Sequence, residues 1–365
     1  MRVGFIGDTI LSNKLTVDDQ LRKLLLQNDF NIANLEAPFV KDNYRPVRDM
    51  GLHQLSDSCQ ILHELKIKGV SLANNHLMDF GSEGLINTLE VLDQNQIGYF
   101  GAGRNLYEST LPLSIQYNNQ SYRFYGAMQN YFHRKHFAAK NKAGVAPWPL
   151  KDFETTPNDG YNFLFLHWNQ EYEVLPEPAS KYYAEQLSDS YHLIIGSHVH
   201  CYQGIQVNKE TPVVYSLGNF SLPHQQYCNT FLKPYPAHCY TGLIYIWDSE
   251  SEDQLIYCQI SENGEGVSFL KKEMISDFIR SNRAINKPLH LSYREYRRHY
   301  KQNRSHSKRP VLSTNNLINQ LIFKNYIRAV LLFQKAEILI AGILDTFGLR
   351  KIFKKILSLF IKRYQ

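Results

Sequence analysis

The stretch Met1-Arg2-Val3-Gly4-Phe5-Ile6-Gly7-Asp8 begins the chain with an apolar run that ends in a carboxylate. Two similar runs follow at 30–35 and 69–73, and each is directly followed by a polar residue, Glu36 and Asn74. Segments with helical periodicity separate the runs, so strand and helix alternate, which is typical of a mainly parallel α/β sheet. The segments expected to be helical are 17–27, 59–66 and 83–92, and a fourth strand is expected at 98–101.

The alternation of predicted strands and helices changes after residue 113. Two apolar runs, 113–117 and 122–127, flank Asn118-Asn119-Gln120, a pattern that predicts a β-hairpin. Further on, the sequence predicts a helix at 179–187 and strands at 161–167, 192–196, 213–217, 242–248 and 254–260. These elements require two kinds of sheet, or two sheets packed together, in a body that ends near residue 275.

Composition narrows the class of protein. The chain has 365 residues, of which 43% are apolar and 13% aromatic, so it can bury a core and is not disordered throughout. No run approaches the length of uninterrupted apolar residues that a membrane-spanning helix needs. Five cysteines without a CxxC pair indicate reduced thiols, and the first residues lack the pattern of a secretory signal. We therefore expect a cytoplasmic protein.

The charge is unevenly distributed. Residues 280–365 contain 19 of the 40 basic and 3 of the 34 acidic residues, so their formal charge is +16 and that of 1–279 is −10. We expect a globular domain at 1–279, a basic linker at 280–310 and a basic amphipathic helical tail at 311–365. Such a tail can contact the inner face of a membrane, bind an anionic polymer, cap the core of the body or remain solvated.

Polar residues at the strand ends predict a site. In an open α/β sheet, ligands bind outside the carboxyl ends of the strands. Taken singly, Asp8 is read as a helix cap, His167 as a hydrogen-bonded interior residue and Asn75-His76 as a turn. The pair His198 and His200 is harder to explain without a ligand. Together with Glu36, the carboxylate, amide and imidazole groups suit one or two divalent ions among Mn, Fe, Zn and Mg.

The sequence resembles the CapA-like proteins, which are associated with bacterial capsule and poly-γ-glutamate synthesis and belong to the calcineurin-like metallophosphoesterase superfamily. The resemblance rests on Gly7-Asp8, NLEAPF at 34–39, ANNHLMDFG at 73–81, GAG at 101–103, HWNQEY at 167–172, IIGSHVHCYQGIQ at 194–206 and YSLGNF at 215–220. It implies a four-layer α/β/β/α metallophosphoesterase-like sandwich, here followed by the basic helical C-terminal extension.

The resemblance also implies roles for individual residues. Glu36 falls at the position of a carboxylate that bridges two metals, and His76 at that of an acid that protonates a leaving group. The remaining metal ligands that it implies are Asp8, Asn75, His167, His198 and His200, with Asn34, Glu171 and Asn219 as supporting residues of the site. His167 and His198 would bind one metal, and His200 the other.

The sequence departs from the family pattern in ways that affect the site. The superfamily has Asp-x-His at the first motif, whereas here Ile10 occupies the histidine position. Glu36 stands where the superfamily has aspartate, and Asn169 replaces a glycine. One metal position therefore lacks an imidazole ligand. Most family members also carry an N-terminal membrane anchor, for which the basic tail is a candidate substitute.

Two functions of different classes follow from these expectations. The first is a metal-dependent hydrolase or transferase that acts on a phosphoester or amide bond of a cell-envelope polymer or its precursor. The second is a non-catalytic, membrane-tethered component of a polymer synthesis or export complex. Nucleic-acid processing is a weaker third, because Tyr293, Tyr296 and Tyr300 alternate with basic residues but form no known nucleic-acid-binding motif.

Overall fold

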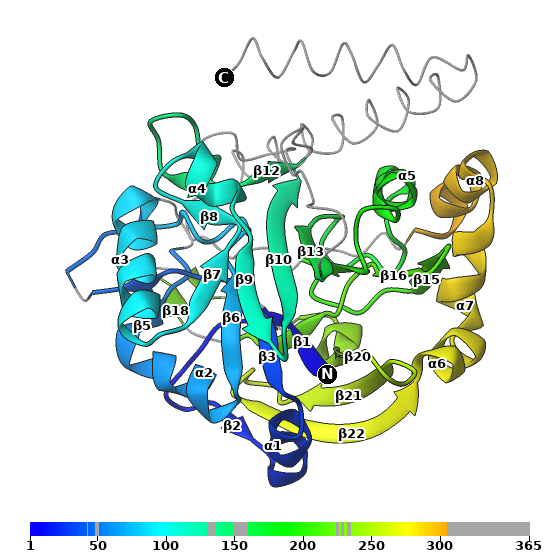
Figure 1. Cartoon of the computed structure of the whole chain (residues 1–365), viewed down its shortest axis with the longest axis horizontal. Coiled ribbons are helices and arrows are strands. Elements are labelled where there is room, and N and C mark those ends of the chain that lie inside the picture. The colour runs from blue at the N-terminus through cyan, green and yellow to red at the C-terminus, as the bar shows by residue number, and fades with distance from the viewer. Residues whose placement is uncertain are drawn as a thin grey trace.

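The computed structural model describes residues 1–41, 43–47, 51–129, 136–148, 160–223, 226–227, 230–231 and 235–304. Two large twisted sheets face each other, with helices on both outer surfaces (Figure 1). The expected tail at 311–365 lies outside the described residues. Among the helices that the structure describes, none is long and apolar enough to span a membrane.

The first sheet joins the N-terminal half of the chain to its later strands. Its strand order is β2-β22-β21-β20-β1-β3-β6-β7, and β17 pairs with the end of β1. Strands β1, β3, β6 and β7 are parallel, while β20, β21 and β22 are antiparallel. The strands are β1 (Arg2–Thr9), β2 (Thr16–Val17), β3 (Phe30–Leu35), β6 (Ile67–Ser71), β7 (Gly98–Phe100), β17 (Asn219–Ser221), β20 (Thr241–Asp248), β21 (Gln254–Ile260) and β22 (Gly266–Met274).

The second sheet has the order β12-β10-β13-β14-β16-β15, with β9 beside β10. The predicted hairpin is confirmed, because β9 and β10 are antiparallel and Asn118 and Asn119 both have positive φ, as a tight hairpin turn requires. The strands are β9 (Leu113–Tyr117), β10 (Gln120–Gln129), β12 (Pro147–Trp148), β13 (Tyr161–His167), β14 (Leu193–Ser197), β15 (Ile205–Asn208) and β16 (Thr211–Val214).

Short pairs and helices complete the body. The two-stranded pairs join β4 (Phe39–Val40) to β5 (Gln54–Leu55), β8 (Ala102–Gly103) to β11 (Gly144–Val145), and β18 (Gln226–Tyr227) to β19 (Thr230–Phe231). The helices are α1 (Asp19–Leu26), η1 (Ser56–Cys59), α2 (Gln60–Glu64), α3 (Gly81–Gln94), α4 (Leu106–Thr110), α5 (Pro178–Leu187), η3 (Ala237–Tyr240), α6 (Ile275–Ser281), α7 (Arg283–Asn286), η4 (Lys287–His290) and α8 (Tyr293–Asn303).

Three apolar clusters define four layers. The central cluster packs the sheets together through residues such as Phe5 and Phe30 of the first and Phe124 and Phe163 of the second. A second cluster packs α1, α2 and α3 on the outer face of the first sheet, and a third packs α5 and α8 on the outer face of the second. The described body is therefore an α/β/β/α sandwich, as expected.

The described part of the expected linker is not a linker. Residues 280–304 form helices that pack on the body, and α8 buries Tyr296 and Tyr300 against the second sheet. The hydroxyl of Tyr296 donates to the backbone oxygen of Pro176 at 2.7 Å. Two tyrosines four residues apart, together with the Ser292–Glu295 capping box, mark this helix although most of its other side chains are charged or polar.

Replacing Tyr296 by Phe tests this packing. The change removes the donor to a buried carbonyl, so we expect the free energy of unfolding to fall by about 1–3 kcal/mol. Urea unfolding measures the loss. Arg298→Ala is the control, since Arg298 is exposed on the same helix. Equal stability of Tyr296→Phe and the wild type would contradict the docking of α8.

Candidate metal centre

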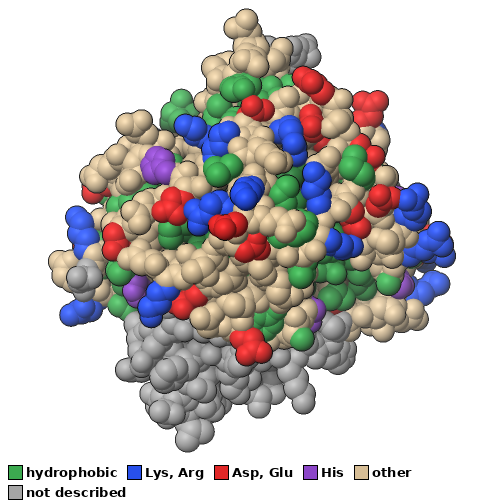
Figure 2. Space-filling model, turned by 90° about the horizontal axis from the view of Figure 1, so that it is seen from below, with side chains coloured by type: hydrophobic (Ala, Val, Ile, Leu, Met, Phe, Trp, Pro, Cys, Tyr) green, Lys and Arg blue, Asp and Glu red, His purple; other side chains and the backbone are tan. Residues whose placement is uncertain are grey.

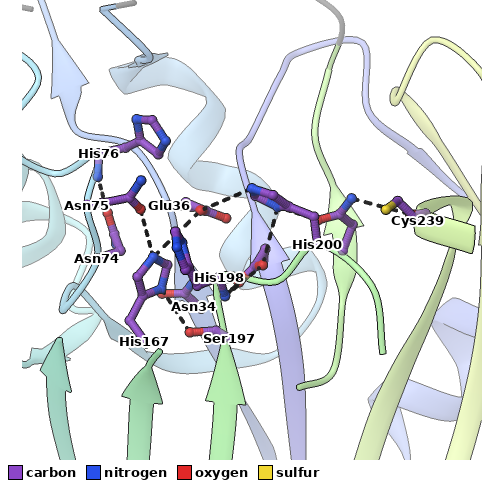
Figure 3. A network of polar contacts seen from close by, with 12 residues as sticks. Asn34, Glu36, Asn74, Asn75, His76, His167, Ser197, His198, His200 and Cys239 are labelled. Atoms are coloured by element: carbon purple, nitrogen blue, oxygen red, sulfur yellow. Dashed lines mark hydrogen bonds and ion pairs between the residues drawn. The ribbon is translucent and has the colours of Figure 1, made fainter. Parts of the chain in front are cut away.

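Polar side chains from both sheets converge where the parallel strands end (Figure 3). Glu36 directly follows β3, His167 is the last residue of β13, and His198 directly follows β14. The predicted strand at 213–217 is shorter than expected, because β16 ends at Val214. Asn219 therefore does not end a strand of the second sheet. It begins β17, which crosses to the first sheet and pairs Asn219 with Asp8.

Asp8 is held firmly at the end of β1. Its carboxylate is fully buried and accepts hydrogen bonds from Asn34 Nδ2 at 2.8 Å and from the backbone N–H of His198 at 3.1 Å. The preceding Gly7 permits the close crossing of β17, because a Cβ there would lie 2.0 Å from the carbonyl oxygen of Gly218. Burial raises the pKa of Asp8, and attraction to His200 and the hydrogen bonds partly oppose it.

Glu36 lies between the histidines and is fully buried. Among the described residues, neither of its carboxylate oxygens has a hydrogen-bond donor. Its Oε1 is 3.9 Å from His167 Nε2 and 4.0 Å from His200 Nε2. Burial raises the pKa of Glu36 well above its usual range, and repulsion from Asp8, Glu171 and Asp79 raises it further.

The histidines are oriented by neighbouring polar groups. His167 Nε2 lies 2.7 Å from Asn75 Oδ1, and its Nδ1 lies 3.0 Å from Ser197 Oγ. His200 Nδ1 lies 2.9 Å from Asn219 Oδ1, so its Nε2 faces Glu36.

The H-x-H segment has an unusual backbone. His198 and His200 have φ of 90° and 63°, in the left-handed region that non-glycine residues seldom adopt. The segment places the His198 ring 4.5 Å, centroid to centroid, from that of His167. Strained backbone of this kind is concentrated at functional sites.

The donor set fits divalent cations. Two groups of side chains have ligand atoms within 4.8 Å of one another: Glu36 with His167 and His198, and Asp8 with Glu36 and His200. Glu36 belongs to both groups. Glu36 is a buried carboxylate whose oxygens lack donors among the described residues, and it lies beside the buried carboxylate of Asp8. Such an arrangement is costly unless positive charge balances it. Carboxylate and imidazole ligands suit Zn, Mn or Fe and do not identify the ion.

The remaining predicted residues surround this cluster. Asn75 contacts it through His167, Asn34 through Asp8, and Asn219 through His200. His76 lies beside the cluster, and Glu171 acts on the charge of Glu36.

Sequence reasoning missed the partner of His76. Asp79, which is fully buried, accepts from His76 Nδ1 at 3.0 Å and from the backbone N–H of Leu52 at 3.1 Å. The spacing of three residues within ANNHLMDFG was the available signal. Ser197, the partner of His167, was likewise present in the quoted GSHVH segment. Ile10, at the position of the missing histidine, is buried in an apolar cluster with Ala37.

The fold and the site together define a class: a four-layer α/β/β/α protein with a carboxylate–histidine cluster at the carboxyl ends of its strands. Residues 16–223, more than half of the chain, match the model of the family described as bacterial capsule synthesis protein PGA_cap. The chain belongs to this family.

Curated relatives agree with the family assignment. The chain is 27% identical over 240 residues to the PGA biosynthesis protein CapA of Bacillus subtilis, which covers 60% of this chain and 63% of the relative. It is 27% identical over 210 residues to the capsule biosynthesis protein CapA of Bacillus anthracis, covering 54% and 51% respectively. The chain thus spans less than two thirds of the length of these relatives. A solved structure described as a novel phosphatase of Mycoplasma pneumoniae is 12% identical, with a TM-score of 0.40 over 75% of this chain and 92% of that one.

Proposed function

We propose that this protein is a metal-dependent hydrolase or transferase that acts in the synthesis of a capsule, poly-γ-glutamate or another cell-envelope polymer. The observation that carries the proposal is Glu36, whose buried carboxylate belongs to both ligand groups and has no hydrogen-bond donor among the described residues. A buried carboxyl group without donors is costly unless a bound cation balances it. The family and its curated relatives support the polymer as the biological context.

The chain's own residues would prepare the reaction. Divalent ions bound at Glu36 would polarise a phosphoryl or carbonyl group and lower the pKa of a water molecule. Asn75, His167 and His198 would hold one ion, and Asp8 and His200 the other, with Glu36 shared. Asn34, Ser197 and Asn219 fix the orientation of these ligands through the hydrogen bonds described above.

His76 is suited to move a proton. Its Nδ1–H donates to Asp79, which leaves Nε2 as the atom that can deliver a proton to a leaving group. Asp79 is therefore a positioning residue, which fixes the tautomer and the orientation of the His76 ring. Tyr172 and Tyr235, whose ring centroids each lie 5.6 Å from that of His200, add aromatic surface beside the cluster.

The alternative is a non-catalytic component of a polymer synthesis or export complex, tethered to the membrane by the basic C-terminal segment. Ile10 favours this alternative. Its apolar side chain stands where a further imidazole would complete the metal position that Asp8 and His200 would form. Here the metal would only stabilise the fold. On either proposal we place the protein in a reducing compartment, at or near the inner face of the membrane. The reducing compartment fits the free, buried thiols of Cys59, Cys201, Cys239 and Cys258.

Substituting His76 by Ala separates the two functions. We expect unchanged metal content and a fall in turnover of about 10²–10⁴-fold, the range that general acid catalysis contributes. Elemental mass spectrometry gives the metal content, and a panel of phosphoesters and γ-linked glutamyl amides gives the turnover. His63→Ala is the control, since His63 is an exposed histidine on α2. If polymer synthesis in cells survives His76→Ala undiminished, the catalytic proposal is wrong and the structural one is supported.

A further inference from the structure

A second group of potential metal ligands, separate from the carboxylate–histidine cluster, includes the residue that follows His200. Cys201 follows His200 directly, and His238 and Cys239 are consecutive residues of η3. One ligand atom from each of the three side chains lies within 4.8 Å of the others. Both cysteines are 1% exposed, while His238 is exposed to solvent. The group therefore combines two thiols shielded from water with an imidazole that gives access from the surface.

The three side chains contact one another. The Cys201 thiol lies within hydrogen-bonding reach of Cys239 and His238. The contact with Cys239 and burial raise the pKa of Cys201, and the contact with His238 opposes this rise. The thiol also lies 3.7 Å from the carbonyl oxygen of Glu173, and His238 Nε2 lies 3.2 Å from that of Tyr172. Three separate chain segments thus meet here. Buried cysteines often serve only as small apolar groups, but that role does not require an imidazole beside two thiols.

We propose that Cys201, Cys239 and His238 form a thiolate metal site for Zn²⁺, distinct from the carboxylate–histidine cluster. Two thiolates and one imidazole are established zinc ligands, which leave the fourth position for water on the exposed His238 side. Thiolates prefer soft and borderline ions, whereas the carboxylates of the other cluster accept Mg²⁺ and Mn²⁺ as well. The two sites therefore differ in metal selectivity.

The zinc site is connected to His200 through one side chain. Asn219 Nδ2 donates to the backbone oxygen of Cys239 at 3.3 Å, while Asn219 Oδ1 lies 2.9 Å from His200 Nδ1. Zinc bound between Cys201 and Cys239 would fix both the turn that carries His200 and the backbone that holds Asn219. The site would thus hold a ligand of the neighbouring cluster in place.

Cobalt absorption tests the site directly. Co²⁺ is added to the reduced, metal-free full-length protein, and thiolate coordination is detected as sulfur-to-cobalt charge transfer in the near ultraviolet. We expect Co²⁺ in excess of what the carboxylate–histidine cluster takes up to give this absorption, and excess Zn²⁺ to abolish it. In Glu36→Gln, which disables the other cluster, the absorption should persist. The test therefore does not depend on the proposed function.

Matched variants assign the ligands. Cys201→Ala and Cys239→Ala should each lose the absorption, whereas Cys59→Ala, which removes a thiol buried in another cluster, should retain it. His238→Ala is safe for folding because the residue is exposed, and it should weaken Co²⁺ binding by at least about 100-fold, since loss of even an outer-sphere partner costs 10–100-fold. Absence of charge transfer in the wild type, its persistence in Cys201→Ala, or unchanged affinity in His238→Ala would overturn the proposal.

Discussion

Replacing Glu36 by Gln is expected to abolish tight metal binding at both ligand groups of the carboxylate–histidine cluster. The two side chains have the same shape, so the variant changes charge and leaves packing intact. Glu36 belongs to both groups, and no other described residue does. We therefore expect the affinity of each position to fall by more than the 10–100-fold that loss of an outer-sphere partner costs.

The same substitution should affect stability in opposite directions with and without metal. Glu36 is buried and is repelled by Asp8, which is why its pKa is raised. The metal-free Gln variant should consequently be at least as stable as the metal-free wild type at neutral pH. With metal at about 100 times its Kd, the wild type should gain about 2.7 kcal/mol and the variant almost nothing.

Thermal unfolding with and without a chelator, together with elemental mass spectrometry, measures these differences. Glu83→Gln is the control, because it makes the same chemical change at an exposed position on α3. Chelator-sensitive stability that persists in Glu36→Gln at the wild-type level would show that Glu36 is not a shared ligand.

Replacing Phe5 by Ala is expected to cause the largest loss of stability among the substitutions considered. Phe5 is fully buried between the sheets, and its ring centroid lies 5.4 Å from that of Phe163 and 5.7 Å from that of Phe165. It also lies within 6.5 Å of Phe124 and Tyr245. Removing a ring from such a cluster costs about 3–5 kcal/mol, a large part of the usual stability of a domain.

Urea-induced unfolding followed by circular dichroism gives the free-energy difference. Tyr107→Ala is the control, since Tyr107 is 72% exposed and its loss should change stability by about 0.5 kcal/mol or less. Phe5→Leu should retain much of the stability if Phe5→Ala proves too unstable to purify. A loss below about 1 kcal/mol for Phe5→Ala would contradict the packing of the two sheets through this residue.

The body does not share the strong positive charge of the C-terminal segment. On the face shown in Figure 2, acidic and basic side chains are interspersed and form no patch of a single sign. The formal charge of residues 1–279 is −10, so the excess of positive charge belongs to the later segment. Binding of an anionic polymer through the tail remains a prediction, because 311–365 lies outside the described residues.

Much of the framework could be predicted from local patterns. The strand at 30–35 has the predicted bounds, and the hairpin turn lies at Asn118-Asn119. Helices α1, α3 and α5 lie where apolar residues recur at helical spacing. These features are accessible from the sequence because the period of side chains along a strand or helix is a property of adjacent residues.

The residues that make up the site could also be predicted from the sequence, for a related reason. Polar residues that follow parallel strands must meet at one edge of a sheet, so Asp8, Glu36, His167 and His198 were expected to lie together. The structure places them together, with Glu36 between the two histidine groups. The sequence did not reveal that both oxygens of Glu36 lack donors, since burial depends on what the two sheets enclose.

The amino-acid sequence by itself determined the order of strands and helices, the family and the residues at the strand ends. Only the tertiary structure decided that β17 crosses to pair with β1, that α8 docks through Tyr296, and that Cys201 meets Cys239. These contacts join residues far apart in the chain, and none leaves a periodic local signal. They depend on the packing of the two sheets and on the loops that connect them, which no single segment specifies.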